Sequence, residues 1–218
     1  MSQNGIFFGG GTAIALKHDE YRLSVDIDLM VSDKAGYRAA KELIGAGDLN
    51  RIFTEPVEYD FRVSDQYAIR GQVIESSTAI KFEIVLDAYL DLTGTGEHDW
   101  LCGVPTLSAA SAVAEKLLAN ADRWADYGVF SRDVLDLAII ATAPNADVDA
   151  FTSGAHQATE AYGATALGSA NRAAQQLLDN PARLARCIDA LSIDALTIID
   201  LQQKLRGLAR LLGQIERG

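Results

Sequence analysis

Several features that would mark a particular class of protein are missing from this 218-residue chain. Its two cysteines, Cys102 and Cys187, are too few for a disulfide framework and lack metal-binding spacing, so they favour reduced thiols in a cytosol. Four prolines and the absence of low-complexity tracts argue against long disordered regions. Apolar runs stay well short of the roughly 20 residues that span a bilayer, and the N-terminus lacks the basic flank of a signal peptide. We therefore expect a cytoplasmic protein with no membrane partner.

Basic residues are scarce as well. The 19 Lys and Arg residues are outnumbered by 30 Asp and Glu residues, which gives a net charge of −11. Proteins that coat nucleic acid are usually basic, so this composition disfavours that class, although it permits an enzyme that holds an RNA end in a local basic patch. Because divalent cations prefer carboxylate oxygens, the acidic composition is compatible with metal binding.

The two halves of the chain show different periodicities. Before residue 105, a segment capped by Ser32 or Asp33 and closed by Gly45 or Gly47 predicts a helix, and alternating or apolar runs predict strands. The strands are expected at 24–31, 66–76 and 78–92, with a turn at 75–77. After residue 105, alanine- and leucine-rich segments predict helices, the last over 192–218 with Ile199 on its apolar face. We predict an α+β protein with an α/β domain over 1–105 and an all-helical domain over 106–218.

Two aspartates, Asp26 and Asp28, stand two residues apart in the first predicted strand. In a strand they share one face, with Cβ atoms about 7 Å apart, while Val25, Ile27 and Leu29 point into the core. Two like charges on an otherwise apolar strand are unfavourable without a counter-ion, and oxygen-only ligation favours Mg²⁺ or Mn²⁺. The alternative is the solvated face of an edge strand.

A third carboxylate, Glu83, lies in the middle of the predicted strand 78–92. If this strand lies beside the strand of Asp26 and Asp28, the three carboxylates form a site that could hold two metal ions about 3.5–4 Å apart. The alternative is that Glu83 pairs with Lys81, which shares its face, on a half-exposed strand.

A glycine turn, GGGTAIAL, begins at residue 9 and leads into a short helix expected over 12–17. The free N–H groups and the dipole at a helix N-terminus favour a phosphate, and Gly10 and Gly11 allow the backbone to approach it closely. Thr12 adds a hydroxyl, and Ser24, on the strand face of the aspartates, could donate another hydrogen bond. The turn is neither a Walker A loop nor a dinucleotide-binding loop, so a plain turn is the alternative.

Taken together, a glycine turn, a helix, a strand with two aspartates and a later strand with a third acid resemble the DNA polymerase β-like nucleotidyltransferases. The stretch GGTAIALKHDEYRLSVDIDLM, residues 10–30, is similar to the AbiEii toxins of bacterial type IV toxin–antitoxin systems in its Arg22, Ser24, Asp26 and Asp28. A second stretch, residues 114–140, resembles the same branch in Glu115, Lys116, Arg123, Arg132, Asp133 and Asp136.

The resemblance implies a polymerase β-like domain with a mixed sheet and an enzyme that moves a nucleoside monophosphate from an NTP to an acceptor. The metal ligands would be Asp26, Asp28 and Glu83, holding Mg²⁺ or Mn²⁺. The nucleotide would be bound by Gly10, Gly11, Thr12, Arg22, Ser24, Lys116 and Arg123, and Arg22 would act by orienting the aspartates.

The second stretch supplies further candidate catalytic residues. Lys116 and Arg123 are seven residues apart, so they share a helix face and could reach the phosphates. Asp133 and Asp136, also on one face, could orient Lys116 or the substrate. A solvated helix face and simple helix packing are the alternatives.

Three functional interpretations stay open. The first is a toxin that modifies an RNA 3′ end, such as that of tRNA, and is paired with a cognate antitoxin. The second is an AMPylator-like enzyme that attaches a nucleotide to a protein hydroxyl, and the third is a non-catalytic, antitoxin-like binding partner of the same fold.

Overall fold

The computed structural model describes residues 5–47, 53 and 55–217 of the chain and separates into two compact units. The sheet unit contains the chain up to Ala13 together with Val25–Ser108, and the helical unit contains Ile14–Ser24 and the chain from Ala109 onward. The sequence did not predict that Ile14–Ser24 would belong to the helical unit. There the amide of Leu23 donates a hydrogen bond to the carbonyl of Leu191 at 3.1 Å.

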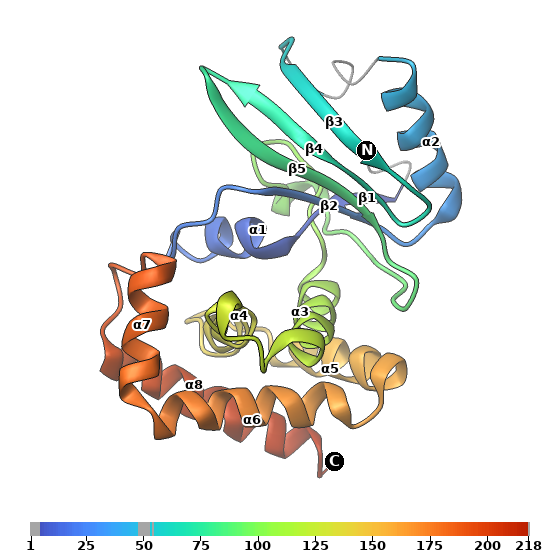
Figure 1. Cartoon of the computed structure of the whole chain (residues 1–218). Helices are drawn as coiled ribbons and strands as arrows, with labels where there is room; N and C mark the ends of the chain where they lie inside the picture. Colours follow the sequence, from blue (N-terminus) through green and yellow to red (C-terminus); the bar gives the residue numbers. More distant parts are fainter. Residues whose placement is uncertain (1–4, 48–52, 54, 218) are drawn as a thin grey trace. The chain divides into compact units, whose positions relative to one another are not determined.

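The sheet unit is built on a five-stranded mixed sheet with the strand order β1-β2-β5-β4-β3 (Figure 1). β2 and β5 are parallel, and the other neighbouring strands are antiparallel. The strands are β1 (Ile6–Phe8), β2 (Ile27–Val31), β3 (Glu58–Ser64), β4 (Ala68–Glu75) and β5 (Thr78–Leu86). The sequence predicted β2, β4 and β5. It missed β1, which is too short to show a periodicity, and β3, whose alternating aromatic residues did carry the signal of a strand.

The hairpin between β4 and β5 turns where the sequence predicted it. Glu75 pairs with Thr78, so the loop consists of Ser76 and Ser77 alone. Both residues have a positive φ, 48° and 69°, as the two central residues of a type I′ turn require. The turn therefore fixes the register of β4 against β5, and with it the neighbours of Glu83.

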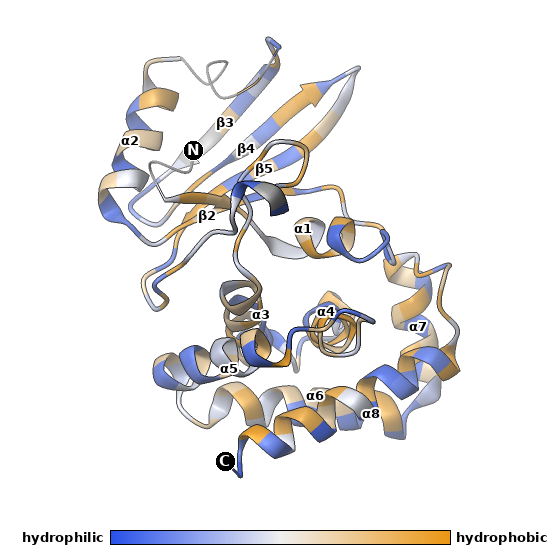
Figure 2. Cartoon of the chain, turned by 180° about the vertical axis from the view of Figure 1, so that it is seen from behind, coloured by the Kyte–Doolittle hydropathy of each residue, from blue (hydrophilic) through white to orange (hydrophobic). Residues whose placement is uncertain are grey.

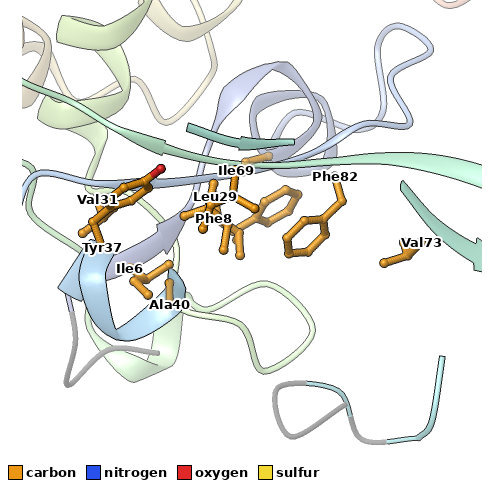
Figure 3. Close-up of a cluster of buried hydrophobic side chains, with 11 residues drawn as sticks. Ile6, Phe8, Leu29, Val31, Tyr37, Ala40, Ile69, Val73 and Phe82 are labelled. Carbon is orange, nitrogen blue, oxygen red and sulfur yellow. The ribbon is translucent and has the colours of Figure 1, made fainter. Parts of the chain in front are cut away.

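One face of the sheet is covered by α2 (Lys34–Gly45), and the core lies between them. As predicted, Asp33 caps this helix, since its carboxylate accepts hydrogen bonds from the amides of Ala35 at 3.1 Å and Gly36 at 2.9 Å. Figure 3 shows the buried side chains, which come from four strands and α2: Ile6, Phe8, Leu29, Val31, Tyr37, Ala40, Ile69, Val73 and Phe82.

β2 is shorter than predicted. It begins at Ile27, so Ser24 and Asp26 belong to the connection before the strand rather than to a strand face. Leu29 is buried and Ile27 is partly buried against the core, as expected, but Val25 is 60 % exposed, and the prediction that it points into the core is wrong. Ile27 is the first residue of β2 that pairs with β5, so Val25 lies outside the sheet and its side chain is not held on the core face.

The helical unit consists mainly of α3 (Ala109–Arg123), α4 (Arg132–Ala141), α5 (Val148–Tyr162), α6 (Thr165–Asp179), α7 (Pro181–Leu191) and α8 (Ile198–Ile215). Figure 2 shows hydrophobic and hydrophilic residues alternating along α6 and α8, as in helices that bury one face. α8 starts later than predicted, because Thr197 and Asp200 form a capping box at its N-terminus. This start leaves Ile199 65 % exposed, which corrects its predicted place on the apolar face. None of the described helices is long and apolar enough to cross a membrane.

Candidate active site

Asp28 of β2 and Glu83 of β5 are direct neighbours in the sheet. The two parallel strands are registered so that Asp28 pairs with Glu83, between the pairs Ile27–Phe82 and Leu29–Ile84. Leu29, Phe82 and Ile84 are buried in the core under α2, so Asp28 and Glu83 lie on the opposite face. These two carboxylates are therefore neighbours in the fold, as the sequence predicted.

Glu83 is also flanked by two cations. Its carboxylate oxygens lie 3.0 Å from Nε of Arg70 on β4 and 2.9 Å from Nζ of Lys81 on its own strand. The pair with Lys81 is the alternative that the sequence suggested, whereas the pair with Arg70 depends on the register of β4 against β5. In this arrangement, no three Asp, Glu, His or Cys side chains among the described residues are grouped so that they could hold a metal ion.

The glycine turn lies against the aspartate strand. The amide of Gly9 donates to the carbonyl of Asp28 at 2.9 Å. Gly10 has a φ of +66°, and a Cβ on it would stand 2.3 Å from Oδ2 of Asp28. A side chain at Gly10 is thus excluded both by the left-handed backbone and by the carboxylate itself.

The turn continues directly into α1 (Gly10–Lys17), as the sequence predicted. The amides of Gly10, Gly11 and Thr12 are the first of this helix and lie at its positive dipole end. Thr12 is nearly buried, and Gly11 is partly exposed. A helix N-terminus and two carboxylates therefore meet on one side of the sheet, which is the combination needed to bind a metal–polyphosphate complex.

The helical unit holds a second group of charged residues, centred on Asp133 and Asp136 of α4. Asp133 accepts from Arg123 at 2.7 Å and 2.8 Å through Nε and Nη2, and from Nζ of Lys116 at 3.1 Å. Lys116 and Arg123 therefore share a helix face, as predicted. Lys116 is only 6 % exposed, which excludes the alternative of a solvated lysine.

Asp136 is completely buried and binds two cations. It lies 2.7 Å from Nζ of Lys116, and Arg22 donates to both of its oxygens, at 2.8 Å from Nε and 3.1 Å from Nη2. The hydroxyl of Tyr21 also donates to Asp136. The five charged side chains of this network, Arg22, Lys116, Arg123, Asp133 and Asp136, carry three positive and two negative charges and so an excess of one positive charge.

Burial and pairing act in opposite directions on these groups. Desolvation would raise the pKa of Asp133 and Asp136, but attraction and hydrogen bonds from Lys116 and the arginines outweigh it and hold both pKa values below the ordinary range. Desolvation likewise lowers the pKa of Lys116, yet the two aspartates raise it overall. Burial, followed by the charge of Asp136, raises the pKa of the Tyr21 phenol. The network is therefore fully ionised at neutral pH, with a neutral Tyr21.

The network changes the roles that the sequence suggested. Arg22 was expected to orient Asp26 and Asp28, but its guanidinium is bound to Asp136. Tyr21 was missed altogether, because no sequence pattern marks a buried phenol that serves as the partner of a distant carboxylate. Among the five charged residues of the network, only Arg123 is substantially open to solvent, with 34 % of its side chain exposed.

Comparisons with known proteins bear on the family and on the fold. The family model for the nucleotidyl transferase AbiEii toxin of type IV toxin–antitoxin systems matches residues 2–207. A search of curated proteins finds no match. Among solved structures, the chain is similar to MenT4, a nucleotidyltransferase toxin from Mycobacterium tuberculosis, with a TM-score of 0.51 and 15 % identity over 98 % of this chain and 78 % of that one. At this identity the likeness shows a shared fold.

Proposed function

The chain belongs to the AbiEii family of nucleotidyl transferase toxins of type IV toxin–antitoxin systems, and we propose that it transfers a nucleoside monophosphate from an NTP to an RNA 3′ end, such as that of tRNA. The acceptor hydroxyl oxygen attacks the α-phosphorus, the bond from that phosphorus to the bridging oxygen of the β-phosphate breaks, and pyrophosphate leaves. The hydroxyl proton passes to solvent. The observation that carries this proposal is the placement of Asp28 beside Glu83 and against Gly10.

The residues of the sheet unit fit a magnesium ion in their chemistry. Asp28 and Glu83 are neighbouring oxygen donors on the face away from the core, and Asp26 stands two residues before Asp28 in the connection. When bound, Mg²⁺ or Mn²⁺ would lower the pKa of the attacking hydroxyl and neutralise charge on the phosphates. Gly10, Gly11 and Thr12 would bind the phosphates through the first amides of α1.

Glu83 must leave its cations to become a ligand. Arg70 and Lys81 have side chains that are 47 % and 52 % exposed, and such surface ion pairs contribute only about 0–1 kcal/mol each. A divalent ion held by Asp28 would attract Glu83 more strongly than one of these cations does, because it would carry two charges. We therefore infer that Glu83 joins Asp26 and Asp28 when the metal–nucleotide complex binds.

In the helical unit we assign direct contact with a phosphate to Arg123, the charged residue of the network that is most open to solvent. Lys116, Asp133 and Asp136 are too buried to touch a substrate in this arrangement, and we assign them, together with Arg22, the positioning of Arg123. This assignment differs from the catalytic roles predicted from the sequence, because burial of the lysine could not be read from its spacing. The excess positive charge of the network supports an anionic ligand.

The proposal is tested with the purified protein, Mg²⁺, each of the four labelled NTPs and total RNA. We expect label at RNA 3′ ends with at least one NTP, none with EDTA, and a loss of about 100-fold or more for Asp28→Asn, because a metal contributes several kcal/mol to the transition state. Asp91→Asn, an exposed residue of the same unit, is the control. Label on protein instead of RNA would mean that the acceptor is a protein hydroxyl. No label with any NTP, or full activity of Asp28→Asn, contradicts the proposal.

The type IV toxin family also supports a cognate antitoxin as partner. Co-expression of the neighbouring gene product should restore growth to cells in which this chain is toxic. Toxicity that depends on Asp28 and is relieved by that gene product would support the pairing, and toxicity of Asp28→Asn would contradict an enzymatic toxin.

A further inference from the structure

The helical unit contains a hollow that the nucleotidyltransferase site does not use. Its volume is about 390 Å³, and its walls come from the end of α1, the end of α4 and the start of α8. A second hollow of about 390 Å³ shares Leu196 and Lys204 with it and continues along α8 to Arg210. Together they form one groove, which we call the α8 groove, of the size at which proteins bind small organic ligands.

The polar part of the groove is basic. Lys17 and His18 stand on the α1 side, and Lys204 and Arg210 stand on α8, against the two acids Asp19 and Asp200. Asp200 is held by Thr197, whose amide and hydroxyl donate to it at 2.9 Å and 2.6 Å. In a chain with a net charge of −11, such a local predominance of cations is unexpected for a surface with no ligand.

Two of these groups are open to a ligand. Lys204 donates a hydrogen bond to the hydroxyl of Thr142 at 3.3 Å, and in the described part of the chain it forms no ion pair. His18 likewise forms no ion pair or side-chain hydrogen bond with any described residue, although it is partly buried. Both can therefore donate to an anion without giving up a strong partner.

The rest of the wall is apolar. Ile139, Pro144 and Leu196 line the hollow together with the polar residue Asn145. A flat ring could pack on such a surface, while inorganic anions would gain nothing from it. The combination of an apolar floor and a basic rim is suited to a ligand with a ring at one end and a phosphate at the other.

The α1 side of the groove is rigidly built. Asp19 and Glu20 both have a positive φ, 57° and 49°, and the amide of Glu20 donates to the carbonyl of Ala15 at 2.8 Å. The next residue, Tyr21, is fixed by its hydrogen bond to Asp136. Residues in such a strained turn persist only when their surroundings hold them, so His18 is presented at a defined position.

We propose that the α8 groove binds a nucleotide, with the phosphate on His18 and Lys204 and the base or ribose on Pro144 and Leu196. The ligand is either a free mononucleotide or one nucleotide of an RNA chain, which share this chemistry. Binding here does not require the metal site of the sheet unit, so the two proposals fail independently.

The test is a calorimetric titration of the purified chain with AMP, GMP, CMP, UMP, inorganic phosphate and a short RNA, all in EDTA so that the metal site is inactive. Lys204→Gln is compared with Arg206→Gln, an exposed cation two residues away on α8 that does not line the groove. We expect a mononucleotide to bind, about tenfold more weakly to Lys204→Gln and unchanged to Arg206→Gln, since one charge-assisted hydrogen bond is lost.

A second readout is the pH dependence. Burial, the largest effect, lowers the pKa of His18, and the charges facing it are those of Lys17, Lys204, Asp19 and Asp136. An anion favours the charged imidazolium, so affinity should rise as the pH falls below about 6.5, and His18→Gln should abolish this rise.

The arms of the titration identify the source of the phosphate. Binding of mononucleotides but not of the short RNA indicates that the ligand is a free nucleotide. Tighter binding of the short RNA than of the mononucleotides indicates that the ligand is one nucleotide of an RNA chain. Inorganic phosphate that binds as tightly as AMP contradicts the role of Pro144 and Leu196. Absence of binding, or equal losses in Lys204→Gln and Arg206→Gln with both variants folded, overturns the proposal.

Discussion

The Cα atom of Gly10 lies so close to Asp28 that a methyl group on it would stand 2.3 Å from the carboxylate oxygen Oδ2. This contact joins the glycine turn to β2 and places the first amides of α1 beside an acidic residue of the sheet. In the proposed function, phosphate and a metal ion would both bind at this point, so the close approach of Gly10 to Asp28 would determine whether the site can form.

Gly10→Ala should therefore damage the site locally. The substitution needs a left-handed φ and displaces Asp28, which we expect to lower nucleotide transfer more than tenfold and the free energy of unfolding by about 1–3 kcal/mol. Gly45→Ala, at the end of α2 with open space around its Cβ, should leave activity unchanged and stabilise by up to about 1 kcal/mol. Transfer assays and urea unfolding measure both. Equal activity and equal stability of the two variants would contradict the contact between Gly10 and Asp28.

Asp136→Asn should destabilise the helical unit. Asp136 compensates the charges of Arg22 and Lys116 in a site with no solvent exposure, and loss of one partner from such a buried group costs about 3–5 kcal/mol. Asp194→Asn, the same change at an exposed loop position, should fall within about 0.5 kcal/mol of the parent chain. Thermal and urea unfolding measure both variants. A small loss of stability in Asp136→Asn would mean that Asp136 does not compensate the charges of Arg22 and Lys116.

The same network predicts how stability depends on pH. Asp133 and Asp136 have pKa values below that of the unfolded chain, about 3.9. Their contribution is therefore complete above pH 4 and is lost as the pH falls through the folded-state values. The raised pKa of Lys116 gives the opposite sign, with stability kept below about pH 10.4 and lost above it. The stability difference between the parent chain and Asp133→Asn, measured by urea unfolding from pH 2 to 11, should be constant between these limits, and a slope in that difference between pH 5 and 8 would contradict the prediction.

Removal of Arg70 should make Glu83 easier to recruit. In Arg70→Gln the carboxylate loses one of its two cations, so the Mg²⁺ concentration at half-maximal transfer should fall about two- to fivefold, as expected from a surface ion pair. Arg38→Gln removes the same charge from the exposed side of α2 and should change nothing. A rise in the Mg²⁺ requirement of Arg70→Gln would show that Glu83 does not serve as a ligand.

Arg183 of α7 should hold the turn that precedes α4. It donates to Ser131 at 3.1 Å and to Gln176 at 2.9 Å, and its guanidinium stacks on Tyr127 at 4.1 Å. Lysine has neither the fork nor the planar group, so Arg183→Lys should lower the free energy of unfolding by about 1–3 kcal/mol.

The exposed Arg186→Lys, on the same helix, is the control. Ser131 and the residue before it have left-handed backbones, so loss of Arg183 should also accelerate hydrogen exchange at the start of α4. Unchanged hydrogen exchange at the start of α4 would show that Arg183 does not hold the turn.

Much of the fold could be predicted from the sequence, because it depends on local patterns. The glycine turn, the helix cap at Asp33 and the two-residue turn between β4 and β5 are each fixed by a few consecutive residues. The boundaries were less accurate. β2 starts after Asp26 and α8 after Thr197, because pairing and capping by specific partners, rather than hydrophobic periodicity, end an element.

By itself, the sequence determined that acidic residues, a glycine turn and a basic pair on one helix exist in this chain. Only the tertiary structure decided which of them meet: Glu83 beside Asp28 through strand register, and Arg22 on Asp136, across more than a hundred residues. It also decided that Lys116 is buried while Lys204 is partly exposed. The physical reason is that charge and periodicity are properties of neighbouring residues, whereas desolvation and ion pairing arise only when distant segments pack together.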